Sequence, residues 1–140
     1  MTRAFLATLL AAWVCAAQPP KPQEPPEEDE SLIPKEYSFN PLQAAREIQV
    51  GNFYFKKGSF RAAAQRFEEA TRWNPQAAEA FLRLAEARER LGVDLRGPAA
   101  AAGREKEMAA ARMAYEKFLE AAPEDKRAAS VRKKLAAWKP

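Results

Sequence analysis

Apolar side chains recur three and four positions apart through most of residues 41–138, which is the spacing of one face of an α-helix. Ala63, Phe67 and Ala70 show this spacing clearly. No part of the region alternates apolar and polar residues with a period of two, so no strand is predicted. The pattern therefore predicts an all-α fold.

Proline, glycine and asparagine divide this region into five predicted helices. Asn40 and Pro41 form a typical helix start, because an asparagine side chain caps the first turn and a proline there loses no needed donor. Gly58 favours the left-handed backbone that ends a helix. We expect Ser59 to cap a second helix over 60–73, followed by a third helix over 75–91 that stops at Gly92 and an irregular segment over 93–97. A fourth helix over 98–122 should have a weak point at Gly103, and a last helix, capped by Asp125, should run to about Trp138.

Residues 1–17 have the order of a secretory signal peptide. Arg3 supplies a positive charge, an apolar run follows, and small residues end it. The run is too short to span a membrane as a helix. Cys15 leaves a second interpretation open, because a cysteine after such a run can be the lipid-modified first residue of a bacterial lipoprotein. Trp13 and Val14 depart from the small residues that this signal requires.

Residues 18–40 are expected to form a disordered linker. They hold six prolines, and six acidic residues against two lysines. Proline removes backbone donors and like charges repel one another, so the segment should be extended and unpacked. The alternative is that Tyr37 and Phe39 staple onto the first helix.

Composition excludes several functional classes. The chain has no histidine and one cysteine, so it offers no Ser-His-Asp triad, no histidine-ligated zinc site and no internal disulfide. It also lacks a glycine-rich phosphate loop. We therefore expect no catalysis, no cofactor and no metal. Residues 41–140 carry 20 Lys and Arg against 13 Asp and Glu, but the two signs are interleaved along helices, so nucleic-acid binding is not expected.

The helices form an internal repeat. Residues 50–54 align with 84–88, and 67–71 with 115–119. The pattern resembles the tetratricopeptide repeat, a unit of roughly 34 residues that forms two antiparallel helices. Glu47 and Arg88 depart from it, standing where the family has an aromatic or leucine and a tyrosine. The resemblance implies a repeat core of Val50, Gly51, Tyr54, Phe60, Ala63, Phe67, Ala70, Phe81, Leu84, Ala85, Tyr115 and Leu119.

The resemblance also implies an order of units. The expected architecture is a short solenoid of antiparallel helix pairs, with a first repeat at 41–75, a second at 76–123 and a capping helix at 124–138. The two halves of the second repeat are out of step, which places an insertion near 92–107. Trp73 and Trp138 remain open between core packing and partner contact.

In this family the first helices of the pairs line a groove that binds peptides or partner helices. The carry-over gives the groove positions Ala45, Ile48, Asn52, Phe55, Lys56, Glu79, Leu82, Glu86, Glu89 and Arg90. Ile48 stands where a lysine would be needed to clamp a C-terminal carboxylate, so that binding mode is not expected. The alternative is that Ile48 and Leu82 pack against Tyr37 and Phe39.

These features together predict an exported adaptor of the bacterial cell envelope, periplasmic or facing outward, that binds another protein. The alternative is a membrane-tethered repeat lipoprotein that assists outer-membrane protein assembly, and it requires a lipidated Cys15. Because three or more repeats are typical for stability, a homodimer is also open.

Overall fold

The computed structural model describes residues 36–138, and within them the chain is all-α, with no strand. The expected signal peptide and most of the expected linker lie outside the described residues. The helices follow in the order α1 (Pro41–Lys56), α2 (Phe60–Trp73), α3 (Ala78–Asp94), the short 3-10 helix η2 (Pro98–Ala100), α4 (Ala101–Ala121) and α5 (Ala128–Ala137).

The first two helices form an antiparallel hairpin. Asn40 caps α1 as predicted, since its side-chain oxygen accepts a hydrogen bond from the amide of Gln43 at 3.0 Å. Gly58 has φ of 76°, which is the left-handed backbone that lets the chain turn back. The amide of Asn40 donates to the carbonyl of Trp73 at 2.9 Å, so the start of α1 lies beside the end of α2.

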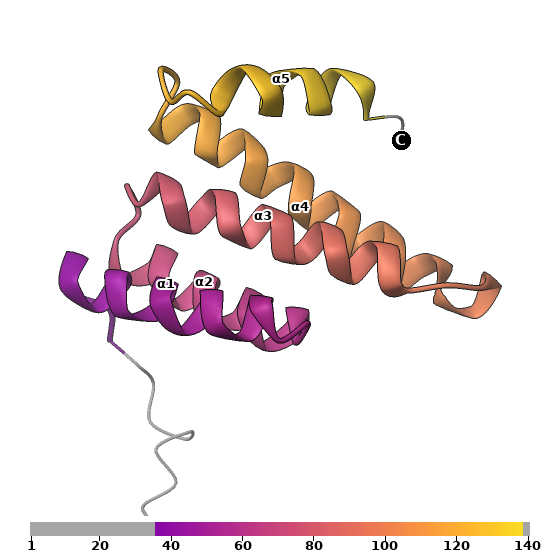
Figure 1. Cartoon of the computed structure of the whole chain (residues 1–140), viewed down its shortest axis with the longest axis horizontal. Helices are drawn as coiled ribbons and strands as arrows, with labels where there is room; N and C mark the ends of the chain where they lie inside the picture. Colours follow the sequence, from indigo (N-terminus) through magenta and orange to yellow (C-terminus); the bar gives the residue numbers. More distant parts are fainter. Residues whose placement is uncertain (1–35, 139–140) are drawn as a thin grey trace, which may run out of the picture. The chain divides into compact units, whose positions relative to one another are not determined.

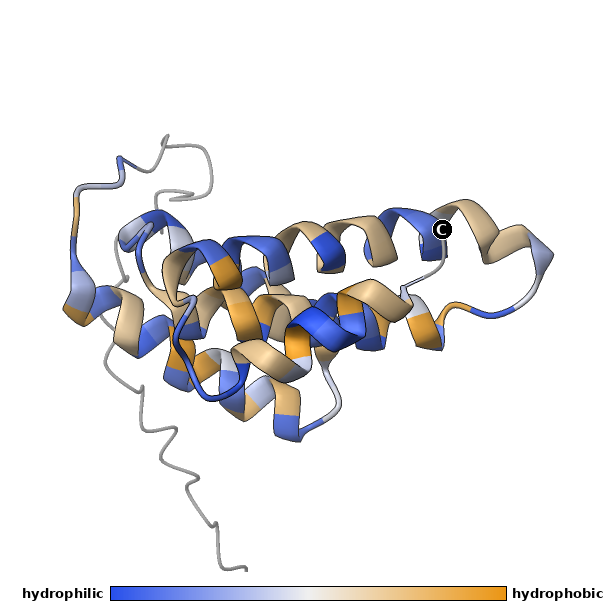
Figure 2. Ribbon diagram, turned by 90° about the horizontal axis from the view of Figure 1, so that it is seen from above, coloured by the Kyte–Doolittle hydropathy of each residue, from blue (hydrophilic) through white to orange (hydrophobic). Residues whose placement is uncertain are grey.

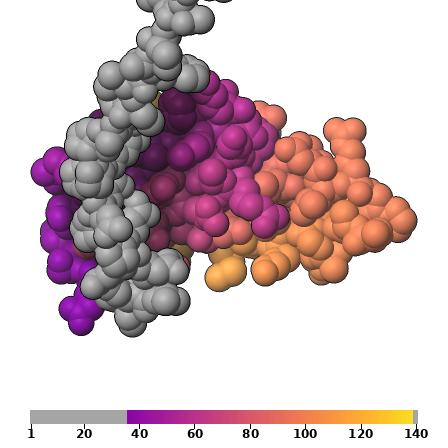
Figure 3. Space-filling view, turned by 90° about the horizontal axis from the view of Figure 1, so that it is seen from below, coloured from indigo at the N-terminus to yellow at the C-terminus, as the bar shows by residue number. Residues whose placement is uncertain are grey.

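Each following helix packs on the one before it, and α1 also contacts α3 (Figure 1). Blue hydrophilic positions run along the outer sides of the helices, with apolar positions between neighbouring ribbons (Figure 2). In the space-filling view, the indigo and magenta surface of α1 and α2 lies beside the orange surface of the α3–α4 end (Figure 3). The apolar contacts thus run from one helix to the next along the chain.

Arg88 ties three helices together from the middle of α3. Its guanidinium donates to Glu68 on α2 and, at 2.8 Å, to Glu107 on α4. Both acids lie about twenty residues from Arg88 in sequence, one on each side. Arg88, one of the two residues that depart from the repeat pattern, is therefore a half-buried link between α2, α3 and α4.

Two helix boundaries differ from the prediction. Gly92 does not end the third helix: α3 continues to Asp94, and Gly92 is buried inside it. A Cβ on Gly92 would lie 2.7 Å from the sulfur of Met108, so this glycine allows α4 to come close. The left-handed glycine of this connection is Gly97, with φ of 87°. The third helix also starts later than predicted, because Asn74 accepts a hydrogen bond from the amide of Gln76 at 3.0 Å and holds a turn there.

The predicted caps at Ser59 and Asp125 are not formed as expected. Ser59 occupies the residue before α2, but its side chain makes no capping hydrogen bond. The Asp125 carboxylate accepts from the amide of Arg127 at 2.8 Å and from its guanidinium, and so fixes the turn that precedes α5. Gly103 lies within α4 without interrupting it.

The residues expected to form the repeat core are buried to different degrees. The buried members are Gly51, Ala63, Phe67, Ala70, Ala85 and Tyr115, and the half-buried ones are Tyr54, Phe60, Phe81, Leu84 and Leu119. Val50 is exposed, so its assignment to the core is wrong. Phe118, which the sequence analysis did not place in the core, is fully buried between α3, α4 and α5.

Phe67→Ala should lower the free energy of unfolding by about 3–5 kcal/mol, because the ring is fully buried between α1, α2 and α3. Urea unfolding followed by circular dichroism measures the change. A loss below about 1 kcal/mol would contradict the packing of this ring.

Gly51→Ala should destabilise the protein by about 1–3 kcal/mol, because the added carbon would lie 2.5 Å from the buried ring of Phe67. Gly103→Ala is the matched control, since its added carbon would meet only Leu95 at 3.4 Å. An alanine inside an uncrowded helix should raise stability by about 0.5–1 kcal/mol. Thermal melts that shift in the same direction for both variants would contradict the close approach of α1 and α2.

Candidate functional site

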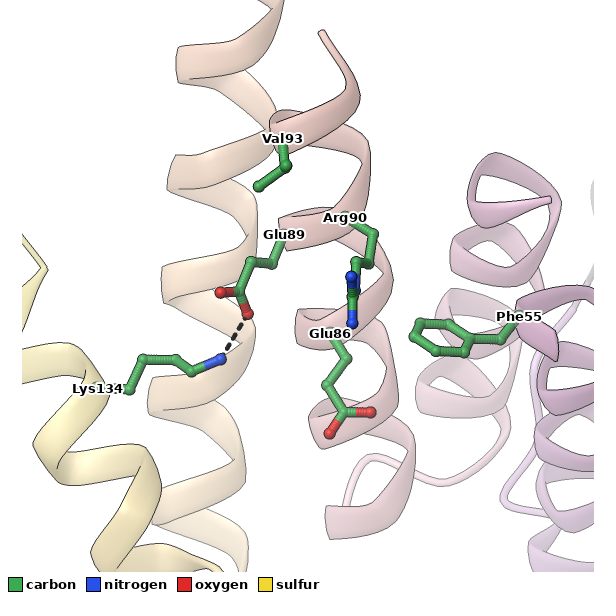
Figure 4. A pocket seen from close by; sticks show the side chains of 6 residues that line it. All are labelled: Phe55, Glu86, Glu89, Arg90, Val93 and Lys134. Atoms are coloured by element: carbon green, nitrogen blue, oxygen red, sulfur yellow. Dashed lines mark hydrogen bonds and ion pairs between the residues drawn. The ribbon is translucent and has the colours of Figure 1, made fainter. Parts of the chain in front are cut away.

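A hollow of about 350 Å³ lies between the end of α1, one face of α3 and the side of α5 (Figure 4). Most of its wall comes from α3, whose lining residues are spaced three, four and seven positions apart and so share one helix face. The lining residues are Phe55, Glu86, Glu89, Arg90, Val93 and Lys134. We call this hollow the α1–α3–α5 groove.

Two apolar side chains stand at the edges of the groove. Phe55 comes from α1 and is held by an edge-to-face contact with Phe60, with the ring centroids 5.2 Å apart. Val93 comes from the last turn of α3 and is exposed. They therefore offer apolar contacts to an occupant from two different helices.

A hydrogen-bonded cluster closes the groove on the side of α5. The Glu89 carboxylate accepts from the Tyr115 hydroxyl at 2.6 Å and from the Lys134 ammonium at 2.7 Å. Burial raises the pKa of Tyr115 far above its ordinary value of 10, and the hydrogen bond to Glu89 adds to the effect. Tyr115 therefore stays a protonated donor at neutral pH and helps to join α3, α4 and α5.

Two charged residues of the groove remain. Glu86 is paired with a neighbouring side chain, and Arg90 is not paired within residues 36–138. Glu86 accepts from Arg83 at 3.0 Å. Arg90 is exposed and has no hydrogen bond or ion pair within residues 36–138. In Figure 4 its guanidinium points along the groove between Glu86 and Phe55. Arg90 is therefore the cation that an incoming carboxylate can reach.

The structure brings together part of the predicted groove. Phe55, Glu86, Glu89 and Arg90 line it, whereas Ala45 and Lys56 are exposed outside its lining, and Asn52 and Glu79 are half-buried outside it. Ile48 is half-buried and packs against the cores of α1, α2 and α3.

Leu82 is not an open groove residue. It is only 3% exposed and packs with α4 and α5, and it reaches the surface only in a smaller hollow of about 160 Å³. The alternative packing of Ile48 and Leu82 on Tyr37 and Phe39 is wrong as well. The Tyr37 ring lies on Trp73 with centroids 4.9 Å apart, and Phe39 is exposed.

Two lining residues were missed by the sequence analysis. Val93 lies beyond Gly92, where the helix was expected to have ended, so the helix periodicity continuing to residue 94 was the available signal. Lys134 reaches the groove because α5 lies across α3 and α4, which no local pattern predicts.

The described residues give no sign of a metal site or a membrane span. Among residues 36–138, no group of three or more Cys, Asp or Glu side chains lies close enough together to hold a metal ion. In that same part of the chain, no helix has the length and apolar character needed to cross a membrane.

The chain matches no known family model, no curated protein and no solved structure.

The raised pKa of Tyr115 leads us to expect that the stability of the protein depends on pH. Its pKa is raised on folding, so ionisation opposes folding once the pH exceeds the unfolded value of about 10. The free energy of unfolding should therefore fall between about pH 8 and pH 11, by up to about 1.4 kcal/mol per pH unit. Urea unfolding at the two pH values measures it, and Tyr115→Phe should show a smaller fall. An equal fall in both proteins would contradict the protonated state of this hydroxyl.

Proposed function

We propose that this chain is a non-enzymatic interaction module that binds an extended peptide or a helix of another protein in the α1–α3–α5 groove. The observation that carries the proposal is the combination within one hollow of two apolar side chains, Phe55 and Val93, with the uncommitted cation Arg90. Helix grooves bind peptides through such apolar contacts, with charged neighbours for orientation.

We infer that the helices stack as tetratricopeptide repeats do. The hairpins α1–α2 and α3–α4 support this, because aligned positions make corresponding contacts. Gly51 faces the ring of Phe67 in the first hairpin, and Ala85 shares a core cluster with Tyr115 in the second. The interval 92–107 contains the end of α3, η2 and the start of α4, which fits an insertion that lengthens the second hairpin.

The groove chemistry favours a particular kind of peptide. Glu86 and Glu89 already have basic partners, so they repel an occupant less than bare carboxylates would. Arg90 attracts a carboxylate, and Phe55 and Val93 offer contacts to an apolar side chain. The proposed ligand therefore presents an apolar residue next to an acidic one.

Export to the bacterial envelope belongs to the same proposal. It rests on the sequence of residues 1–17, which lies outside the described residues.

The double substitution Arg90→Glu and Val93→Asp should weaken partner capture at least tenfold while leaving the helical circular dichroism spectrum unchanged, because both side chains are exposed. The measurement is photo-crosslinking in the producing cells, with a photoreactive residue at position 56 beside the groove. Met113→Asp on α4 is the control, since Met113 is 66% exposed outside the groove. An unchanged set and yield of crosslinked proteins in the double variant would refute the groove.

A further inference from the structure

The face of α1 turned away from α2 carries exposed apolar side chains that no other helix of residues 36–138 covers, and the Lys57 ammonium lies over the Phe53 ring, 5.4 Å from its centroid. Leu42 is 65% exposed and Phe53 57% exposed, and Val50 lies between them on the same side of the helix. Phe39 is exposed just before the helix starts. Single exposed apolar residues are ordinary, but a row of them along one helix marks an interaction surface. We call this row the outer face of α1.

The repeat alignment identifies the face of α3 that corresponds to this row. Val50 aligns with Leu84 and Phe53 with Ala87, since residues 50–54 match 84–88. On α3, Leu84 and Ala87 pack against α2, in a cluster with Phe67. The outer face of α1 is therefore the position at which one helix pair receives the last helix of a preceding pair.

The same alignment extends to two further positions on this side of α1. Arg46 corresponds to Ala80, which packs with Ala70 of α2, and Lys57 corresponds to Leu91, which packs in the cluster with Phe67. The molecule thus contains its own example of what covers such a face, namely one antiparallel helix with small residues and the rings of Phe67 and Trp73.

The outer face of α1 differs in charge from the aligned face of α3. Where α3 has Ala80 and Leu91, α1 has the exposed cations Arg46 and Lys57. The single acid of α1, Glu47, is 7% exposed and accepts hydrogen bonds from Gln43 and Arg66. The exposed charge of α1 is therefore entirely positive.

This charge argues against a second copy of the chain as the occupant. Two copies joined through this face would place Arg46 and Lys57 of both chains in one interface with no exposed acid of α1 beside them, and like charges in an interface are unfavourable. An occupant with acidic residues beside its apolar face gains from the same cations.

We propose that the outer face of α1 binds an amphipathic helix of a partner protein, which packs antiparallel on α1 and carries acidic residues beside a narrow apolar face. This contact continues the helix stack beyond α1. It uses different residues from the α1–α3–α5 groove and does not depend on that groove binding a ligand.

A peptide built on α2 provides a defined probe, because α2 covers the corresponding face of α3. The probe is a synthetic peptide of residues 60–73 with Arg61→Glu, Arg66→Glu and Arg72→Glu, labelled for fluorescence anisotropy with the full chain. We expect saturable binding that weakens with added salt, and at least tenfold weaker binding by the Phe53→Asp chain. Met113→Asp and the groove variant Arg90→Glu should bind the probe as well as the unchanged chain.

Each other outcome refutes the proposal. Absence of saturable binding, or equal binding by the Phe53→Asp chain with an unchanged melting temperature, would show that this face does not accept an acidic helix. Sedimentation equilibrium that shows a dimer lost on Phe53→Asp would assign the face to a second copy. Binding to phosphatidylglycerol vesicles that is lost on Phe53→Asp, without peptide binding, would assign it to a membrane surface.

Discussion

The paired helix backbones come close together beneath aromatic rings, and this packing positions the other elements of the molecule. At Gly51 the ring of Phe67 occupies the space where any other residue would place a Cβ. In the second hairpin Ala85 and Tyr115 lie in one core cluster. Interiors are packed densely enough that one added methyl group is felt, so these small residues set how near the paired helices lie. The spacing of the hairpins in turn sets the width of the hollow between α1 and α3.

The position of α5 gives this helix two roles. Val131 and Ala128 of α5 bury Leu82, which would otherwise be exposed on α3. From the same helix Lys134 reaches across to Glu89 and Tyr115 and forms a wall of the groove. Exposed ion pairs contribute only about 0–1 kcal/mol each, so the apolar contacts hold α5 in place and the polar ones orient it. A loss of α5 would therefore remove part of the core and part of the proposed site together.

The two proposed surfaces differ in charge, and this separates the partners they suit. The groove mixes acids and bases, and most of its charges are already paired, with Arg90 as the exception. The outer face of α1 has only positive exposed charge along an apolar row. We propose an acidic amphipathic helix for the second surface and a short segment with one apolar and one acidic residue for the first. On these two proposals, the module would hold two segments at once, on two sides of α1.

Local sequence patterns predicted the helical class, the cap at Asn40, the left-handed turn at Gly58 and part of the buried core, because these depend on side chains close together along the chain. The surroundings of Leu82, Val50 and Gly92 depend instead on contacts between helices that are distant in sequence. Leu82 is buried because α5 folds back over it, and Val50 is exposed because no helix within residues 36–138 covers it. Gly92 stays inside a helix because Met108 packs against its bare backbone. Local periodicity shows which face of a helix is apolar, whereas a partner helix distant in sequence decides whether that face is covered.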